Sequence, residues 1–314
     1  MNGAVDSGVR EPRIDLNADL GEGGPADAAL LALVSSANIA CGAHAGDAQT
    51  MARTVAEAAA QGVAIGAHPG YADREHFGRL PLDLPPEAVY RLVTEQISAL
   101  AAIAQATNAH LVHVKPHGAL YNQAARDPER AAAIAQAIRD FDPSLVLVGL
   151  AGSALIEAGL THGLTVGREA FADRRYEADG NLTPRRHPDA LIHDPDEAAD
   201  QVLSLLQQGH LRTRNGQSVA MTADTVCVHG DSPAALALVQ RIRQALANAG
   251  IAVRPLGAAR GSTLVPNQPP PLTRLCSQRV WAEAHIPLVG FTTPGVGFMT
   301  MRHETYRLTR EKLF

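Results

Sequence analysis

The chain has 314 residues, of which 46% are hydrophobic, 19% are charged and only 4% are aromatic. This length fits one large domain or two smaller ones, and an alanine-rich, aromatic-poor composition favours helices packed on a sheet over a β-sandwich. A formal net charge of −5 without a basic stripe argues against nucleic acid as the main partner.

The start of the chain and its cysteines predict a cytoplasmic protein. Residues 1–12 are expected to form a flexible N-terminus, and they lack the apolar region of a signal peptide. No apolar run approaches the roughly 20 residues of a membrane span. Three cysteines, Cys41, Cys227 and Cys276, form neither a CxxC pair nor a disulfide framework.

From residue 13 onwards the chain repeats one pattern. A short β-type run ends in a polar or glycine-rich loop, and an alanine- and leucine-rich helical stretch follows. The apolar centres of these runs are typical of strands buried on both faces of a parallel sheet. The seven predicted strands are Arg13–Leu20, Ala37–Cys41, Val63–His68, His110–His117, Leu145–Leu150, Leu164–Phe171 and Thr225–His229.

The stretches between the strands carry helix start and stop residues. Asp47 is a candidate N-cap, and a helix over 86–107 has an apolar stripe that only Gln96 interrupts. Three pairs place a capping residue before a proline at the first helical position: Asp127-Pro128, Asp194-Pro195 and Ser232-Pro233. Three glycines lie where left-handed residues end helices: Gly62, Gly209 and Gly250.

Seven βα repeats with right-handed crossovers form either a closed barrel or an open doubly wound sheet. A span of roughly 250 residues favours an α/β fold of the TIM-like (β/α) barrel type, distorted by its odd strand number. The open sheet remains the alternative, although no GxGxxG or GxxxxGK[ST] motif follows the first strand.

The barrel is predicted over residues 13–256, and the repeating pattern stops after it. The segment AARGSTLVPNQPPPLTR is typical of a linker. Residues 257–314 form an unassigned C-terminal extension, either a partly ordered appendage or a segment that docks on the barrel or on a partner chain.

Polar residues gather where the predicted strands end. In DLNAD the period of two places Asp15, Asn17 and Asp19 on one face of the first strand. Because the carboxyl ends of parallel strands share one edge, side chains that follow different strands are expected to meet in one pocket. The strand ends supply Glu22, Asn38, His44, Asp47, His68, Lys115, His117, Tyr121, Glu169, Arg174 and His229.

Six motifs, in this order, resemble the LamB/YcsF family: DLNADLGEG, NIACGAHAGD, IGAHPGYADREHFGR, HVKPHGALYN, EAFADRRY and CVHGDSPAAL. The family is identified as the A subunit of the prokaryotic 5-oxoprolinase. The resemblance implies a seven-stranded, deacetylase-like barrel, partner subunits B and C, and ATP-dependent opening of 5-oxoproline to L-glutamate with release of ADP and phosphate. In HFGRL, His76 and Leu80 depart from the GFGRR that the family usually has, which leaves the contacts of this loop open.

Such a reaction needs cations for the substrate carboxylate and phosphate, a base for water and an acid for the leaving nitrogen. We assign Asp19 or Asp15 as base or metal ligand, and Glu22 is a further acid that can orient water or hold a divalent ion. Lys115 is assigned to phosphate or oxyanion stabilisation, and His117 with His44 to proton transfer, on the expectation that the pocket histidines titrate near neutrality. Predicted substrate-binding residues are Asn17, His68, Tyr121, Glu169, Arg174 and His229. The predicted cofactor is ATP with Mg²⁺, and predicted ligands of a further divalent metal ion are Asp15, Asp19 and His68.

Residues 173–187, with four arginines, are predicted to form a mobile loop over the pocket mouth or an interface for the other subunits.

Two other functions fit the same residues. Acids and histidines at the first strand ends suit a metal-dependent amide or carbohydrate deacetylase that acts alone, although no HExxH motif is present. A non-enzymatic carrier of 5-oxoproline would use the same pocket. A requirement for ATP and partner chains separates the oxoprolinase from the deacetylase, and tolerance of His117 substitution identifies the carrier.

Overall fold

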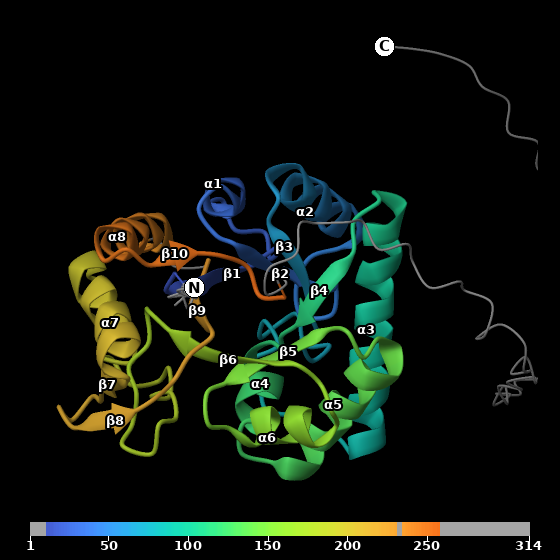
Figure 1. Ribbon diagram of the computed structural model, residues 1–314. Coiled ribbons are helices and arrows are strands. Elements are labelled where there is room, and N and C mark those ends of the chain that lie inside the picture. The colour runs from blue at the N-terminus through green and yellow to red at the C-terminus, as the bar shows by residue number, and fades with distance from the viewer. Residues whose placement is uncertain (1–10, 231–233, 258–314) are drawn as a thin grey trace, which may run out of the picture. The chain divides into compact units, whose positions relative to one another are not determined.

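Seven parallel strands close into a barrel in the computed structural model, which describes residues 11–230 and 234–257. The strands are β1 (Arg13–Leu20), β2 (Ser36–Ala40), β3 (Ala64–His68), β4 (Leu111–Val114), β5 (Val146–Leu150), β6 (Val166–Phe171) and β9 (Thr225–Val228). The ring closes because β1 pairs with both β2 and β9 (Figure 1). The predicted seven-stranded, TIM-like barrel is therefore confirmed, and the open sheet is wrong.

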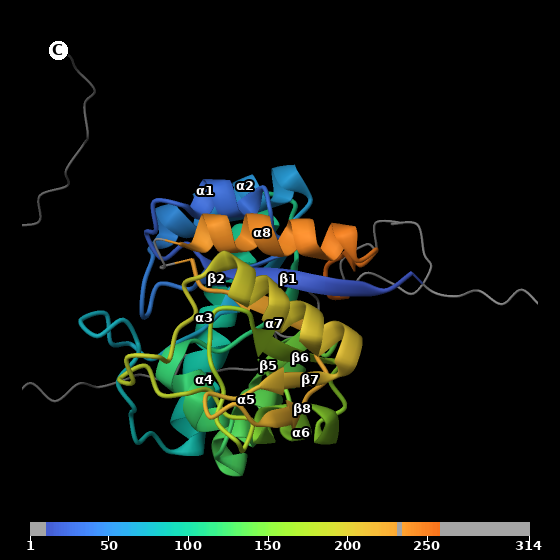
Figure 2. The same cartoon turned by 90° about the vertical axis from the view of Figure 1, so that its left-hand side faces the viewer.

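Helices surround the barrel strands, as two perpendicular views show (Figures 1 and 2). They are α1 (Asp27–Leu31), α2 (Ala48–Gln61), α3 (Pro86–Ala106), α4 (Gly118–Ala124), α5 (Pro128–Phe141), α6 (Ala154–Thr161), α7 (Pro195–Gln208) and α8 (Ala235–Asn248). In the described part of the chain, none of them is both long and apolar enough to cross a lipid bilayer.

Three short strands were not predicted. β10 (Ala252–Val253) adds to β1 in parallel, and β7 (His210–Arg212) forms an antiparallel hairpin with β8 (Ser218–Ala220) beside α7. Strands of two or three residues are too short for a hydrophobic period to mark them in a sequence.

Predicted helix boundaries are largely confirmed. Asp47, Asp127 and Asp194 each accept hydrogen bonds from backbone N–H groups in the first turn of α2, α5 and α7. The three predicted glycines all have left-handed φ values near +70°, namely Gly62, Gly209 and Gly250. The predicted start at Ser232-Pro233 lies outside the described residues, as do the predictions for residues 1–10 and 258–314.

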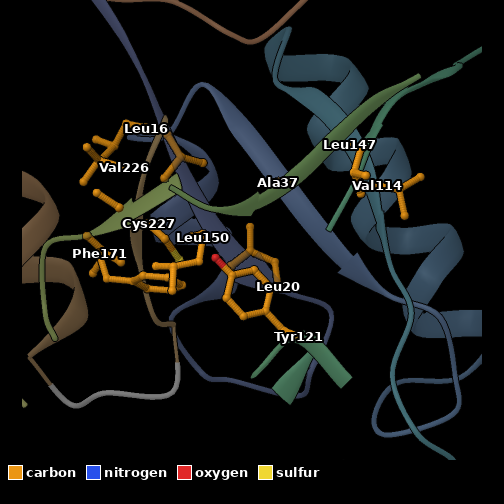
Figure 3. Packing of buried hydrophobic residues seen from close by; sticks show 14 of the residues in the cluster. Leu16, Leu20, Ala37, Val114, Tyr121, Leu147, Leu150, Phe171, Val226 and Cys227 are labelled. Carbon is orange, nitrogen blue, oxygen red and sulfur yellow. The ribbon is translucent and has the colours of Figure 1, made fainter. Parts of the chain in front are cut away.

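Strand β1 carries apolar side chains on one face and polar side chains on the other. Leu16, Ala18 and Leu20 are fully buried in the hydrophobic core, and Figure 3 shows Leu16 beside its β9 register partner Val226. The alternate side chains point into the barrel and are also buried. A polar barrel interior of this kind is tolerated only when its groups are hydrogen-bonded or bind a ligand.

Candidate active site

A cavity of about 610 Å³ opens at the carboxyl ends of the barrel strands. Seven of the predicted site residues line it: Asp19, His68, Lys115, His117, Tyr121, Arg174 and His229. They come from five different strand ends or from the loops and helix α4 that follow, so the topology brings together side chains that are up to 210 positions apart in sequence.

The floor of the cavity is a buried ion-pair network around Lys115, which is 2% exposed. Its Nζ lies 2.9 Å from Asp19 Oδ1, 2.9 Å from Glu169 Oε1 and 3.1 Å from the sulfur of Cys227. Burial alone favours neutral groups, but the attraction outweighs it: the pKa of Lys115 is raised well above its ordinary value and the pKa of Asp19 is lowered. Both groups are therefore charged at neutral pH.

Asn17 and Glu169 do not line the cavity but lie beneath it, where they are 2% and 0% exposed. Asn17 Nδ2 donates to Glu169 Oε1 at 3.1 Å, and Asn38 Nδ2 donates to Asp19 Oδ1 at 2.8 Å. Asn17 and Asn38 therefore orient the two carboxylates that hold Lys115. Contact of Asn17 or Glu169 with the substrate stays a prediction.

Asp15 lies apart from the other two predicted metal ligands, Asp19 and His68. Asp15 and Asp19 are four positions apart along the strand, which is about 13 Å. The Asp15 carboxylate accepts hydrogen bonds from the hydroxyls of Ser35, Ser36 and Thr225. Its oxygens are thus used in the barrel interior, away from the cavity mouth.

Replacing Asp15 with asparagine is expected to change how stability depends on pH. Burial raises the pKa of Asp15 to about 6, although the three hydroxyls partly oppose this. A raised pKa in the folded state stabilises the fold at low pH, and this stabilisation is lost as pH rises through about 6. Urea unfolding should show the wild-type advantage over Asp15→Asn falling by about 2 kcal/mol between pH 4 and pH 7. A difference that is constant over this range would contradict the assignment.

Four side chains at one wall of the site converge on a single point. Glu22 Oε1 lies 3.2 Å from His44 Nε2, 3.3 Å from His117 Nδ1 and 3.8 Å from His68 Nε2. All four donor atoms lie within 4.8 Å of one another, so among the residues that the structure describes this group could hold a metal ion. The sequence indicated Glu22 as an acid able to hold a divalent ion, but the ligand set predicted for that ion was Asp15, Asp19 and His68.

The histidines differ in protonation from the sequence-based expectation. Burial lowers the pKa of His44 to about 3, and burial together with His68 depresses the pKa of His117 strongly, so titration near neutrality is wrong for both. Burial also acts on His68, but the Asp19 carboxylate outweighs it and raises the pKa of His68.

The loops hold these imidazoles in tight contact with backbone. A Cβ atom at Gly70 would lie 2.6 Å from His44 Nδ1, and one at Gly78 would lie 2.8 Å from His44 Cβ. The polar interruption of α3 has a role here, because Gln96 both donates to and accepts from the Gly70 backbone. Arg74 clamps the loop that carries His44 by donating to the carbonyls of residues 42 and 46.

The two residues that depart from the family pattern lie at the surface. His76 is exposed and pairs with Asp73, and Leu80 is 45% exposed. Between them, Arg79 lines the cavity and its guanidinium lies 4.9 Å from the centre of the Phe77 ring.

Six arginines line the cavity: Arg79, Arg126, Arg130, Arg174, Arg185 and Arg186. Arg174 is 5% exposed, and burial together with the nearby Arg185 lowers its pKa to about 10. The sequence pointed to the arginines of residues 173–187 but missed Arg79, Arg126 and Arg130, which are spread over other loops and helix α5. The segment is anchored by Asp173, which accepts from His229 Nδ1 at 2.9 Å, and by the fully buried Tyr176.

Comparisons with known proteins show what the chain is similar to. The lactam utilization protein from Thermus thermophilus is 46% identical, with a TM-score of 0.73, and the match covers 77% of this chain and 99% of that one. A weaker likeness, at 13% identity and a TM-score of 0.46, is to the catalytic domain of a peptidoglycan N-acetylglucosamine deacetylase from Eubacterium rectale, covering 83% and 96% of the two chains. Residues 14–261 match the LamB/YcsF family, and the chain therefore belongs to it.

Proposed function

We propose that this chain is the A subunit of 5-oxoprolinase and that, with subunits B and C, it opens 5-oxoproline to L-glutamate at the expense of ATP. The observation that carries the proposal is the buried Lys115 and Asp19 pair at the floor of a cavity ringed by six arginines, in a chain of the LamB/YcsF family. The name of the Thermus relative points to a lactam, and 5-oxoproline is a five-membered lactam that carries a carboxylate.

The arginines fit the charges of this reaction. A lactam resists water because ring opening sacrifices amide resonance, and phosphorylation of its carbonyl oxygen makes the carbon electrophilic. ATP, bound with Mg²⁺, would supply that phosphoryl group. Within the described residues, Nε of Arg174 is buried without a hydrogen-bond partner, and Arg185 lies close to it. Such an under-compensated guanidinium suits the carboxylate of the substrate or a phosphate.

The other cavity residues suit the proton transfers. Asp19 is ionised and can accept a proton from the water that attacks the activated carbon. His229 Nδ1 is bonded to Asp173, which leaves Nε2 to deliver a proton to the leaving nitrogen. The sequence pointed to His117 for this proton transfer, but His117 Nε2 lies 2.9 Å from the carbonyl oxygen of Phe77 and donates to it. We therefore assign the transfer to His229. One water opens the ring and a second releases the phosphate.

Reconstitution tests the proposal. The chain is combined with candidate B and C subunits, and glutamate, ADP and phosphate are measured with each component omitted in turn. We expect equal amounts of glutamate and phosphate, formed only when all three chains and ATP are present. Glutamate formation by this chain alone would refute the proposal that it works only within the three-chain complex.

The histidine wall favours one other function, a metal-dependent deacetylase-type hydrolase that acts alone. Release of acetate from acetamido sugars by the isolated chain without nucleotide would support it.

Arg174→Met is expected to raise the KM for 5-oxoproline or ATP by about 10- to 100-fold, because one charge-assisted hydrogen bond is lost. The neighbouring Arg175 gives a matched control, since it pairs with Glu197 and does not line the cavity. Steady-state kinetics of the reconstituted complex should show no more than a small change for Arg175→Met. Equal effects of both substitutions would contradict an anion-binding role for Arg174.

A further inference from the structure

The wall formed by Glu22, His44, His68 and His117 has the geometry of a metal coordination sphere. In a tetrahedral zinc site with Zn–N and Zn–O bonds of about 2.0–2.1 Å, neighbouring donor atoms are about 3.3 Å apart. Here Glu22 Oε1 lies 3.2 Å from His44 Nε2 and 3.3 Å from His117 Nδ1, and His117 Nδ1 lies 3.0 Å from His68 Nε2. Each residue contributes one donor atom.

The hydrogen bonds on the far sides of two rings fix which nitrogens face one another. His68 Nδ1 lies 2.7 Å from the carbonyl oxygen of Lys115, and His117 Nε2 lies 2.9 Å from that of Phe77. A carbonyl oxygen only accepts, so each of these nitrogens carries the ring proton. Backbone carbonyls orient metal-binding histidines in this way.

The remaining nitrogens face each other and two carboxylates. His68 Nε2 lies 3.0 Å from His117 Nδ1, 3.3 Å from Asp19 Oδ2 and 3.8 Å from Glu22 Oε1. A proton on His68 Nε2 makes a good hydrogen bond to only one of these neighbours at a time. A cation at the common point would interact with both imidazoles and with the Glu22 carboxylate at once.

The surrounding backbone is built to keep the rings in place. His44 and His117 stack with their ring centres 3.8 Å apart and their planes within 1°, so one ring must turn before both lone pairs meet at one ion. Phe77, which supplies the carbonyl for His117, has a φ of +57°, a left-handed conformation that is uncommon for a bulky residue. Strain of this kind persists where the neighbouring structure enforces it, often at functional sites.

We propose that Glu22, His44, His68 and His117 bind a divalent transition-metal ion of the zinc and cobalt class. Three imidazole nitrogens and one carboxylate oxygen suit these ions, whereas Mg²⁺ prefers oxygen ligands and retains its waters. His68 and His117 also line the cavity, so the ion would lie at its edge, where it could polarise a carbonyl group or a water molecule. This inference does not rest on the oxoprolinase function.

Metal titration of the full chain tests the proposal directly. After treatment with EDTA and dialysis, calorimetry with ZnCl₂ should show one ion bound per chain, and millimolar MgCl₂ should not compete. Cobalt(II) should give the visible d–d absorption of a four- or five-coordinate site, and zinc should raise the melting temperature. Absence of zinc and cobalt binding by the folded wild-type chain would overturn the proposal.

Variants locate the ion. We expect His44→Gln and Glu22→Gln each to weaken zinc binding about 100-fold or more, because a direct ligand matters at least as much as an outer-shell partner. His229→Gln is the matched control, since His229 lines the same cavity outside the cluster, and it should bind zinc like the wild type. Circular dichroism checks folding, and Glu22→Gln carries the test if His44→Gln does not fold. Wild-type affinity in a folded Glu22→Gln variant would place the ion elsewhere.

Discussion

Replacing Lys115 with methionine is expected to abolish ATP-coupled glutamate formation and to lower the free energy of unfolding by about 3–5 kcal/mol. Methionine fills a similar volume but removes the cation that lies 2.9 Å from both Asp19 and Glu169. Two buried carboxylates then face each other without compensation, and protonation of one of them is the least costly response. Urea unfolding at pH 7 measures the loss of stability, and the reconstituted assay measures turnover.

A surface pair provides the control for this prediction. Arg168 and Asp224 also form a close ion pair from a barrel strand, at 2.7 Å, but their side chains are 42% and 33% exposed. Arg168→Met is expected to cost about 1 kcal/mol or less, because water solvates the carboxylate that is left. If Lys115→Met is no more destabilising than Arg168→Met, the ion pairs of Lys115 do not stabilise the barrel.

A second variant separates stability from catalysis. In the double variant Lys115→Met/Glu169→Gln, an uncharged amide replaces the Glu169 carboxylate, and Asp19 no longer faces a second buried charge. Much of the lost stability should therefore return, while glutamate formation remains absent. Recovery of turnover together with stability would show that Lys115 acts only as a structural cation.

The sequence predicts the barrel because its signals are local. The period of two in β1, the helices that begin with proline and the βα repeat each depend on neighbouring residues, and together they favour the closed ring of seven strands that the structure shows. The same reasoning places polar side chains at one edge, since parallel strands end together. This reasoning identifies the residues on one face of a strand but not how far each lies from the cavity. For that reason Asp15 and Asp19 were both predicted to bind a metal ion.

The histidine wall shows what local signals leave out. Three separate loops and Glu22 meet there, and the fit depends on contacts such as the carbonyl of Phe77 on His117. Burial is equally invisible in a sequence, so His44 and His117 were given the pKa values of exposed imidazoles. The arginines of the cavity come from distant segments, and only their position in three dimensions marks them as one site.

Asp19 and Glu169 both form ion pairs with Lys115, but we expect only Asp19 to take part in catalysis. Asp19 lines the cavity, whereas Glu169 is fully buried beneath it. Both lie 2.9 Å from the same ammonium group, so either isosteric amide substitution leaves Lys115 with one carboxylate. The effects of the two substitutions on stability should therefore be similar, about 1.5–3 kcal/mol each.

Their effects on turnover should differ widely. Asp19→Asn removes the proposed base from the cavity and is expected to reduce kcat about 1,000-fold. Glu169→Gln changes only the support of Lys115 and is expected to reduce kcat about 10-fold or less, while the Oε1 position that Lys115 contacts is still occupied by an acceptor. Steady-state rates and urea unfolding of both variants, measured on the same reconstituted preparations, decide the question. Equal losses of kcat would mean that Asp19, like Glu169, serves only to hold Lys115.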